Sequence, residues 1–409
     1  MSGGDLGRIQ VALDARVLQH ALVNSADGGL GGPGRYAHEL LKALRHHDAE
    51  LLLLVDHGPI PRRLHDLVAS TERFRLRRVG LGGRLPRRLV YGRAAGLVGQ
   101  VESPLLGRQL GRLRPAVVHI VDQPPPRLRL RPRIVTLHDL GPLRAGAGAV
   151  GVSSPGAAAR SGLAGALTAD VTFCVSEATR RDAIRVLGIA PERAEVLHPG
   201  VDTRRFSPGV VDGVRGELGL PQHARYFLHV GVLHERKNPE GLLAAFRALA
   251  RSSQDLHLVC AGPYQTSPEA SRRVRGLALQ LGVEARLHLV GDLPDATLVR
   301  AYRGSLGLVF PSLHEGFGFP VVEALACGVP VVAGDNSSLP EVGGNLAVLV
   351  DANDHGAIAD GMRRVLDDDR LRARAQAAGP DWAKRFSWEA AAARVHEVHV
   401  ELTAKARRR

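Results

Sequence analysis

The stretch LGLVFPSLHEGFGFPVVEALACGVPVVAGD, residues 306–335, decides the fold of this chain. It reads as a buried strand that ends at Phe310, a loop that carries Glu315, a helix that Pro320 opens and Gly328 closes, and a second strand. Strand, crossover helix and strand in succession are typical of a parallel sheet with helices on its faces. The segment therefore predicts a doubly wound α/β architecture.

Apolar runs of strand length repeat this pattern along the chain. They are IQVAL (9–13), LLLLV (51–55), FRLRRV (74–79), AVVHIV (116–121), RIVTL (133–137), VTFCV (171–175) and AEVL (194–197), then YFLHVG (226–231), LHLVCAG (256–262), ARLHLVG (285–291), LGLVF (306–310), VPVVAG (329–334) and LAVLV (346–350). Helix-length stretches such as PEGLLAAFRALARS (239–252) supply the crossovers. Two such series in one chain predict two Rossmann-like domains.

The domain boundary is expected in HPGVDTRRFSPG (198–209), which is rich in glycine and proline. We predict one domain over residues 1–200 and a second over 201–386. Residues 387–409 form a closing helix with no strand after it. That helix could pack on either domain, and we predict that it packs back on the N-terminal one.

Composition sets the protein class. The chain has 409 residues, 44% apolar and 23% charged, which excludes a disordered or fibrous protein. It holds no apolar run of about 18 residues, and its start, MSGGDLGRIQVALDAR, predicts no secretory signal. Its three cysteines are far apart without a CxxC spacing, so neither a zinc site nor a disulfide framework is expected. These features predict a cytoplasmic protein with buried thiols.

Positive charge is concentrated in residues 62–133. This segment holds 17 arginines and 4 acidic residues, a net +13 that equals the net charge of the whole chain. The arginines are either solvated residues of ordinary surface helices or a surface for anionic lipid or an acidic acceptor. The second interpretation would make the protein peripheral on the inner membrane face. Nucleic acid is disfavoured as a partner, because the segment has no array of stacking aromatic residues and no DNA-binding motif.

Two glutamates flank the glycines of the deciding stretch. Glu315 precedes the helix and Glu323 lies one turn into it, while Gly316 and Gly318 let the backbone approach a ligand closely. The N-terminus of the helix favours an anion, whereas a carboxylate accepts hydrogen bonds from the vicinal hydroxyls of a ribose or hexose. The plainer alternative is one solvated glutamate and one that caps the helix.

Cations and a histidine follow two other predicted strands. Arg236 and Lys237 come after the strand that ends near Gly231, just before a helix that begins near Pro239. Adjacent cations at this edge suit a diphosphate, although a plain surface pair would look the same. His138 follows the strand RIVTL, where a lone histidine is either a core or cap residue or a member of the active site.

The loop EGFGFPVVEALACGVPVV, together with GVLHERKN, closely resembles the retaining glycosyltransferases of family four, which have the GT-B fold. The segments ALDARVL, GGPGRYAHEL, IVTLHDLGPL, VSEATRRD, VLHPGVDTRRFSP, VGDLPDATLVRAYRGS and SSLPEVGG also fit the order of that family. The resemblance implies two Rossmann-like domains that face a cleft. The N-terminal domain would bind the acceptor and the C-terminal domain the nucleotide sugar.

The resemblance also implies roles for residues. Glu323 would hold the ribose of the nucleotide, and Glu315 would act as a catalytic residue on the donor sugar. Arg236 and Lys237 would neutralise the leaving diphosphate, so neither a metal nor a cofactor is expected.

Further contacts are implied on both domains. The backbone N–H groups around Phe317 and Gly318 would help to hold the sugar and the diphosphate. His138 would be a catalytic residue that faces the donor sugar. Within the glycine loop 28–34, three residues would lie near the diphosphate and the acceptor: Gly31, Gly32 and Gly34.

The implied activity is a retaining hexosyl transfer from a nucleotide sugar to a hydroxyl of a saccharide, a lipid-linked acceptor or a small molecule. The segments ALDAR and GPGRY resemble mannosyltransferase-like members and favour GDP-mannose as donor, with UDP-glucose and UDP-N-acetylhexosamine as alternatives. A sugar-nucleotide epimerase and a non-catalytic binder of nucleotide sugars are rival functions within the same fold.

A rival from another class is an NAD-dependent oxidoreductase. Gly29, Gly31 and Gly34 match the spacing of a dinucleotide fingerprint, and Asp56 follows a strand about twenty residues later. The fingerprint, however, needs its glycines in the turn directly after the first strand. Here about fifteen residues separate Leu13 from Gly29, which disfavours this rival.

Overall fold

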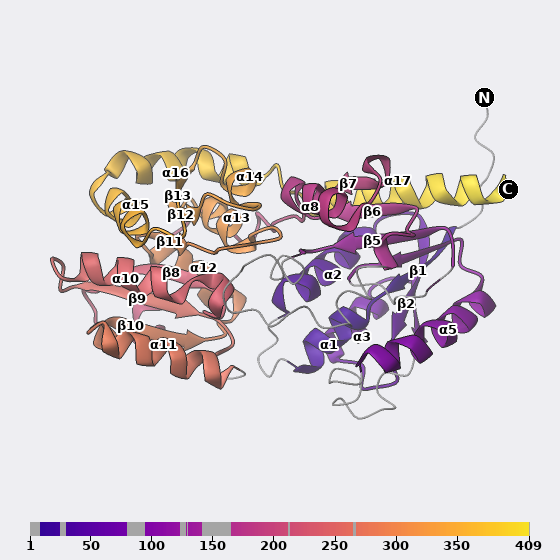
Figure 1. The fold of residues 1–409 in the computed structure, drawn as a ribbon, viewed down its shortest axis with the longest axis horizontal. Coiled ribbons are helices and arrows are strands. Elements are labelled where there is room, and N and C mark those ends of the chain that lie inside the picture. Colours follow the sequence, from indigo (N-terminus) through magenta and orange to yellow (C-terminus); the bar gives the residue numbers. More distant parts are fainter. Residues whose placement is uncertain are drawn as a thin grey trace. The chain divides into compact units, whose positions relative to one another are not determined.

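A computed structural model describes residues 9–24, 30–79, 95–122, 128, 130–140, 165–211, 213–264 and 267–408, without the side chains of 23–24 and 95–103. The chain divides into two compact units. Unit 1 comprises Met1–Gly200 and Trp388–Arg409, and unit 2 comprises Val201–Ser387 (Figure 1). Each unit is described by itself below.

Unit 1 is built on a parallel sheet of 7 strands. In spatial order these are β3 (Phe74–Arg78), β2 (Ala49–Val55), β1 (Ile9–Asp14), β4 (Val117–Ile120), β5 (Arg133–Leu137), β6 (Val171–Cys174) and β7 (Ala194–Val196). Its helices are α1 (Arg16–Asn24), α2 (Gly31–Leu44), α3 (Arg62–Ala69), α5 (Ala95–Leu113), α8 (Glu177–Leu187) and α17 (Trp388–Arg407). The inner strands are buried along their length because helices cover the sheet.

Unit 2 repeats the plan with a parallel sheet of 6 strands. Their order is β10 (Leu287–Gly291), β9 (Leu256–Ala261), β8 (Arg225–Val230), β11 (Gly307–Phe310), β12 (Val331–Gly334) and β13 (Ala347–Val350). The helices are α9 (Val214–Glu217), α10 (Pro239–Ala250), α11 (Pro268–Gln280), α12 (Asp295–Gly304), α13 (Phe319–Ala326), α14 (Leu339–Gly343), α15 (His355–Asp367) and α16 (Asp369–Ala383). A core cluster of mostly Leu, Val, Ala and Phe side chains joins α10, α11 and α15 to the sheet.

The predicted doubly wound α/β fold is confirmed, since every apolar run quoted above is a strand. The helix of the deciding stretch begins at Phe319, one residue before Pro320, because Gly318 takes the N-cap position at φ 104°. Gly328 follows the last turn at φ 73°, a backbone conformation that favours glycine. Among the described residues, none of the helices is both long and apolar enough to cross a membrane.

The closing helix α17 belongs to unit 1, as Figure 1 shows by its place beside the strands of that unit. It packs on α2, β1 and β4. Arg394 ties it to the edge strand β7 through Glu195, with Nε to Oε1 at 2.5 Å and Nη2 to Oε2 at 3.0 Å. The first unit is therefore assembled from both ends of the chain.

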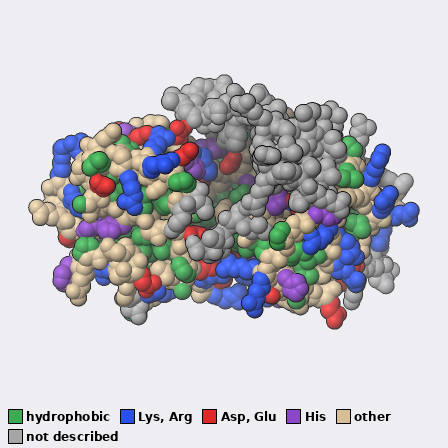
Figure 2. All heavy atoms as spheres, turned by 90° about the horizontal axis from the view of Figure 1, so that it is seen from below, with side chains coloured by type: hydrophobic (Ala, Val, Ile, Leu, Met, Phe, Trp, Pro, Cys, Tyr) green, Lys and Arg blue, Asp and Glu red, His purple; other side chains and the backbone are tan. Residues whose placement is uncertain are grey.

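Several arginines of the segment 62–133 have acidic neighbours from outside it. Arg73 lies 3.6 Å from Asp48, and Arg75 lies 2.8 Å from Glu50. Arg133 is buried in β5, although a basic surface would need it exposed. The sum of +13 over the segment thus overstates its local charge. On the face that Figure 2 shows, basic side chains lie among acidic and neutral ones.

Candidate active site

The site forms where the strand order of unit 2 changes direction. Strands β8 and β11 are neighbours in the sheet, and the chain continues from them toward opposite edges. Ligands of open α/β sheets bind at the carboxyl ends of such a strand pair. The loops that follow are residues 231–238 after β8 and residues 311–318 after β11. They carry Arg236, Lys237 and Glu315.

The loop after β11 is fixed by side chains of the loop after β12. Ser337 Oγ accepts a hydrogen bond from the Glu315 N–H at 2.9 Å. Ser338 Oγ donates to the carbonyls of Phe317 at 2.7 Å and Glu315 at 3.1 Å. The backbone on both sides of the Glu315 side chain is consequently held in place. The sequence analysis assigned no role to these serines, although their position directly after a buried strand was a usable signal.

The loop after β8 forms a short 3-10 turn, Glu235–Lys237. Asn238 ends it at φ 57°, where asparagine is better tolerated than most residues, and its side chain caps α10 by accepting from the Gly241 N–H at 3.0 Å. The Arg236 carbonyl accepts from the Leu313 N–H at 2.9 Å. This bond joins the two loops, so that their side chains share one site.

Both cations contact the Glu315 carboxylate. Lys237 Nζ donates to Oε1 at 2.6 Å, and Arg236 Nη1 donates to Oε2 at 3.3 Å. Glu315 is 7% exposed and Lys237 is 9% exposed. Burial alone would raise the pKa of the Glu315 carboxyl, but Lys237 and Arg236 outweigh it and hold the pKa below its usual value. Two cations and one carboxylate leave one net positive charge, which suits an anionic ligand.

A neutral wall lies beneath the cations. Lys237 Nζ lies 4.3 Å from the centre of the Phe310 ring, a cation–π contact. The ring of His229 stacks on Phe310 with centres 5.6 Å apart, and its Nδ1 lies 3.0 Å from the Val309 carbonyl. Burial lowers the pKa of His229 to about 3, so the imidazole is neutral near pH 7. The charge of the site therefore comes from the two loops and not from His229 on strand β8.

Glu323 lies on α13 and is 1% exposed. Its Oε2 accepts a hydrogen bond from the Tyr302 hydroxyl on α12 at 2.8 Å. Tyr302 was not predicted as a site residue, because a buried aromatic residue on a crossover helix is typical of a core. Its hydroxyl fixes the orientation of the carboxylate that the resemblance assigns to the ribose.

Phe317 and Gly318 shape the turn into α13. Phe317 is buried, and its ring meets those of Phe319 and Phe386 edge to face at 5.2 Å and 5.5 Å between centres. A Cβ on Gly318 would lie 2.9 Å from Leu339 Cδ2, and the residue adopts φ 104°. Any other residue at this position would be strained and would crowd the loop that carries Glu315.

The predicted residues of the first domain lie in unit 1. His138 Nε2 lies 2.7 Å from the Val121 carbonyl, and its ring meets Tyr36 of α2 edge to face at 4.9 Å. The glycines of α2 differ among themselves. A Cβ on Gly34 would lie 2.6 Å from Ala21 Cβ on α1, so packing of the two helices already accounts for this glycine, whereas Gly31 and Gly32 face open space. Gly28 and Gly29 lie outside the described residues.

Unit 1 has an ion pair at its own switch point between β1 and β4. The Arg16 guanidinium donates two hydrogen bonds to the Asp14 carboxylate, from Nε to Oδ1 at 2.9 Å and from Nη2 to Oδ2 at 2.6 Å. Burial would raise the pKa of Asp14, but Arg16 outweighs it and the pKa is lowered. The sequence analysis quoted this ALDAR segment without assigning a role to either side chain.

The geometry of unit 1 conflicts with the dinucleotide fingerprint. Helix α1 lies between β1 and the glycines, which open α2 instead of forming the turn after β1. Asp56 is engaged by α1, since its carboxylate pairs with His20 and its N–H donates to Gln19 Oε1 at 2.7 Å. The pyrophosphate-binding turn that an NAD-dependent oxidoreductase requires is thus absent from this part of the described chain.

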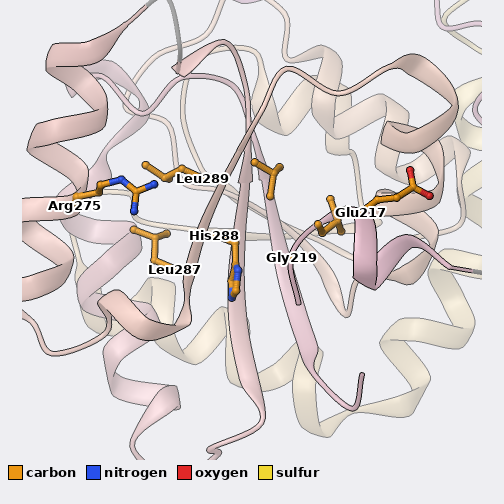
Figure 3. A pocket seen from close by; sticks show the side chains of 8 residues that line it. Glu217, Gly219, Arg275, Leu287, His288 and Leu289 are labelled. Atoms are coloured by element: carbon orange, nitrogen blue, oxygen red, sulfur yellow. The ribbon is translucent and has the colours of Figure 1, made fainter. Parts of the chain in front are cut away.

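Two other features of the described residues bear on ligands. No group of three or more His, Cys, Asp or Glu side chains that could hold a metal ion occurs among them, and metal independence stays a prediction. An open groove of about 330 Å³ lies over the edge strand β10. Figure 3 shows Arg275 of α11 and His288 of β10 on one side of it and Glu217 on the other. This groove involves none of the predicted site residues.

Comparison with family models covers both units. Residues 30–205 match the model described as "Glycosyltransferase Family 4", and residues 212–382 match the one described as "Glycosyl transferases group 1". A D-inositol 3-phosphate glycosyltransferase of Corynebacterium glutamicum strain R is 34% identical over 245 residues, which span 58% of this chain and 58% of that protein. A second relative with the same activity in its name, from Catenulispora acidiphila, is 34% identical over 226 residues, 53% of each chain. The chain thus matches little more than half the length of these curated relatives.

Solved structures share the fold over nearly the whole chain. Sucrose-phosphate synthase from Thermosynechococcus elongatus has a TM-score of 0.78 at 21% identity and covers 97% of this chain and 100% of its own. The Anabaena protein HepE, solved with UDP-glucose, has a TM-score of 0.71 at 16% identity and covers 97% and 100%. At these identities the likeness concerns the fold alone.

Proposed function

The chain belongs to the family 4 glycosyltransferases of the GT-B fold, and from this we propose that it transfers a hexose from a nucleotide sugar to a hydroxyl acceptor with retention of configuration and without a metal. The observation that carries the proposal is the contact of Lys237 and Arg236 with Glu315 at the switch point of unit 2. A diphosphate leaving group gains charge as the glycosidic bond breaks, and fixed cations at that position lower the barrier.

The nucleotide and the sugar have separate partners in this proposal. Lys237 and Arg236 hold the diphosphate, Glu323 accepts hydrogen bonds from the ribose hydroxyls, and Glu315 faces the sugar. His138 of unit 1 supports the transferring sugar, and the backbone around Phe317 and Gly318 supports the diphosphate. What supports these assignments is the residue types, the position of the loops at the carboxyl ends of the strands, and the burial of Lys237, Glu315 and Glu323.

GDP-mannose is our proposed donor, and the segments ALDAR and GPGRY support it by their likeness to mannosyltransferase-like members. UDP sugars are the main competitors, because a solved neighbour of the same fold holds UDP-glucose. Among acceptors, the names of the relatives favour a phosphorylated cyclitol as the first compound to try. Saccharide and lipid-linked hydroxyls complete the acceptor panel.

The test begins with a thermal-shift screen against GDP, UDP, ADP and TDP sugars and NADH. A ligand that binds the folded state raises the melting temperature by mass action. We expect a selective rise with GDP-mannose, followed by transfer to an acceptor with release of GDP. The one-bond coupling between the anomeric carbon and its proton in the product reads out retention, and chelation of divalent ions should leave the rate unchanged.

Other results would exclude the proposal or redirect it. A shift with NADH alone would favour the oxidoreductase. Free monosaccharide or an isomerised sugar nucleotide without acceptor would favour the epimerase. Donor binding without turnover across the acceptor panel would favour a non-catalytic binder.

A further inference from the structure

The ion pairs of Glu315 place a carboxylate where an anionic ligand should bind. Its two oxygens accept from Lys237 at 2.6 Å and from Arg236 at 3.3 Å. These are the donors that the proposed function assigns to the diphosphate. Carboxylate and phosphate oxygens require the same N–H groups in the same directions, so one competes with the other for them.

The neighbouring carboxylate does not share this position. Glu235 lies in the same turn, but its Oε1 accepts from Arg273 of α11 at 2.9 Å, and that arginine also contacts Glu240 at 2.7 Å. Glu315 is therefore the carboxylate that these two loops present to Lys237 and Arg236. Arg236, Lys237 and Glu315 together carry one net positive charge, and the two cations without Glu315 would carry two.

The exchange involves a side chain and not a loop. The Glu315 N–H is held by Ser337 and its carbonyl by Ser338, so its backbone has little freedom to withdraw. Rotation about the side-chain bonds suffices to move the carboxylate off the cations. The same rotation turns it into an acceptor for the hydroxyls of a sugar.

We propose that Glu315 is an internal counter-anion of the diphosphate subsite, an inference that rests on the proposed function. In the empty site it neutralises Lys237, whose burial would make an uncompensated charge costly. The incoming diphosphate displaces it, and its return to the cations as the product leaves speeds release. Glu315 thus acts as a positioning residue that weakens diphosphate binding.

Inorganic pyrophosphate tests the idea without knowledge of the base or the sugar. It is titrated calorimetrically, without divalent metal, into the full chain and into Glu315→Gln. We expect the dissociation constant to fall about tenfold in the variant, the order for removing one negative charge a few ångströms away in a partly solvated site. The variant without ligand should melt lower than the wild type, and pyrophosphate should raise its melting temperature more.

Matched variants separate this role from a merely structural one. Glu235→Gln removes the same charge from the adjacent turn and should leave pyrophosphate affinity unchanged. Lys237→Met should weaken binding at least tenfold. The double variant Lys237→Met/Glu315→Gln restores one net positive charge and should bind more tightly than Lys237→Met. Because the double variant removes both buried charges together, this comparison remains readable even if Glu315→Gln alone fails to fold.

Turnover supplies a further readout. Product inhibition by the nucleoside diphosphate should strengthen in Glu315→Gln while kcat falls, whereas a carboxylate that only contacts the sugar would leave the affinity for pyrophosphate unchanged. Unchanged or weaker pyrophosphate binding in Glu315→Gln overturns the proposal, as does the absence of binding at millimolar concentration in wild type and variant. Tighter binding without turnover of any nucleotide sugar would uphold the counter-anion and reject the sugar transfer.

Discussion

At the scale of single residues, the two carboxylates of unit 2 have different tasks. Glu315 faces two cations, whereas Glu323 is held by a phenol on a neighbouring helix. A buried carboxylate that accepts from a hydroxyl is equipped to accept from another hydroxyl, as the ribose offers. The difference assigns charge recognition to the loops and hydroxyl recognition to α13.

Replacement of Glu323 should therefore weaken nucleotide binding without removing the anion site. We expect Glu323→Ala to weaken the binding free energy of the nucleotide sugar by about 1.5–3 kcal/mol, the range for hydrogen bonds to a charged group. Tyr302→Phe should cost less, because it loosens the carboxylate without removing it. Calorimetry with the donor found in the screen measures both, and Glu284→Ala on the exposed turn before β10 is the charge-matched control. Unchanged donor affinity in Glu323→Ala would remove this residue from the site.

Residue types and their place after strands singled out Arg236, Lys237 and Glu315, and the resemblance to the family assigned them to one donor, which stays a prediction. They could not show that the cations already contact the carboxylate, since that depends on the turn at Asn238 and on the serines after β12. Tyr302 was not predicted, because its buried aromatic ring is typical of a core residue and the sequence does not show that its hydroxyl contacts Glu323. The ligand role of Gly34 stays a prediction, and its close approach to Ala21 is a packing constraint that the sequence does not show.

At the scale of elements, α17 is docked by histidines as well as by apolar side chains. His399 of α17 lies with Nε2 3.3 Å from Nδ1 of His119 on β4, and both are fully buried. Burial lowers the pKa of His119 to about 3, and burial together with His119 and His396 lowers that of His399 well below its usual value. Both imidazoles are thus neutral where the helix is docked.

Mild acid should loosen this helix. A histidine whose pKa is lower in the folded than in the unfolded state does not reduce the free energy of unfolding above pH 6.5. As the pH drops from 6.5 toward the pKa of the folded state, the free energy of unfolding falls. The slope is up to about 1.4 kcal/mol per pH unit for each histidine, because the unfolded state binds the extra protons. We expect the hydrogen-exchange protection factors of residues 388–407, which correct for the slower intrinsic exchange in acid, to fall between pH 6.5 and 5, and less steeply in His399→Leu. His355→Leu, an exposed histidine of unit 2, is the control, and an equal slope in all three proteins would contradict the assignment.

The strands were predictable because parallel strands buried on both faces appear in the sequence as continuous apolar runs. The crossover helices were predictable from the helix-length stretches between those runs. The order of the strands within each sheet was not predicted. The docking of α17 was one of two options, since an amphipathic helix with no strand after it can cover either sheet. What decides it are long-range contacts such as Arg394 with Glu195, which no local pattern contains.

At the scale of the whole molecule, the charge of +13 acts through its distribution. The edge strand β3 carries Arg75, Arg77 and Arg78, and charged side chains on an edge strand discourage pairing with other sheets. Part of the segment 62–133 is therefore explained without a partner. Within the described part of the segment, Arg108 and Arg112 on α5 are exposed and could meet an anionic surface.

An anionic membrane is one of the partners that the sequence analysis left open for the arginine-rich segment. If the segment binds lipid, vesicles that contain phosphatidylglycerol should bind the protein, and salt should weaken binding. Arg108→Gln/Arg112→Gln on α5 should lower the affinity about tenfold or more, at roughly 1 kcal/mol for each charge. The equal change Arg363→Gln/Arg364→Gln on α15 should have little effect in a cosedimentation assay. Binding that ignores lipid charge and salt would reject the membrane hypothesis and leave solvated arginines as the explanation.

The return of α17 to unit 1 also sets an order of events on the ribosome. Unit 2 is one continuous stretch, Val201–Ser387, and is synthesised completely before Trp388 is added. Unit 1 lacks the helix that packs on α2, β1 and β4 until Trp388–Arg407 have been synthesised. Unit 2 is therefore complete before unit 1, whereas domains usually fold in order from the N-terminal one. Part of the sheet of unit 1 stays uncovered until α17 has been synthesised. This is the stage of synthesis at which we expect the nascent chain to need a chaperone most.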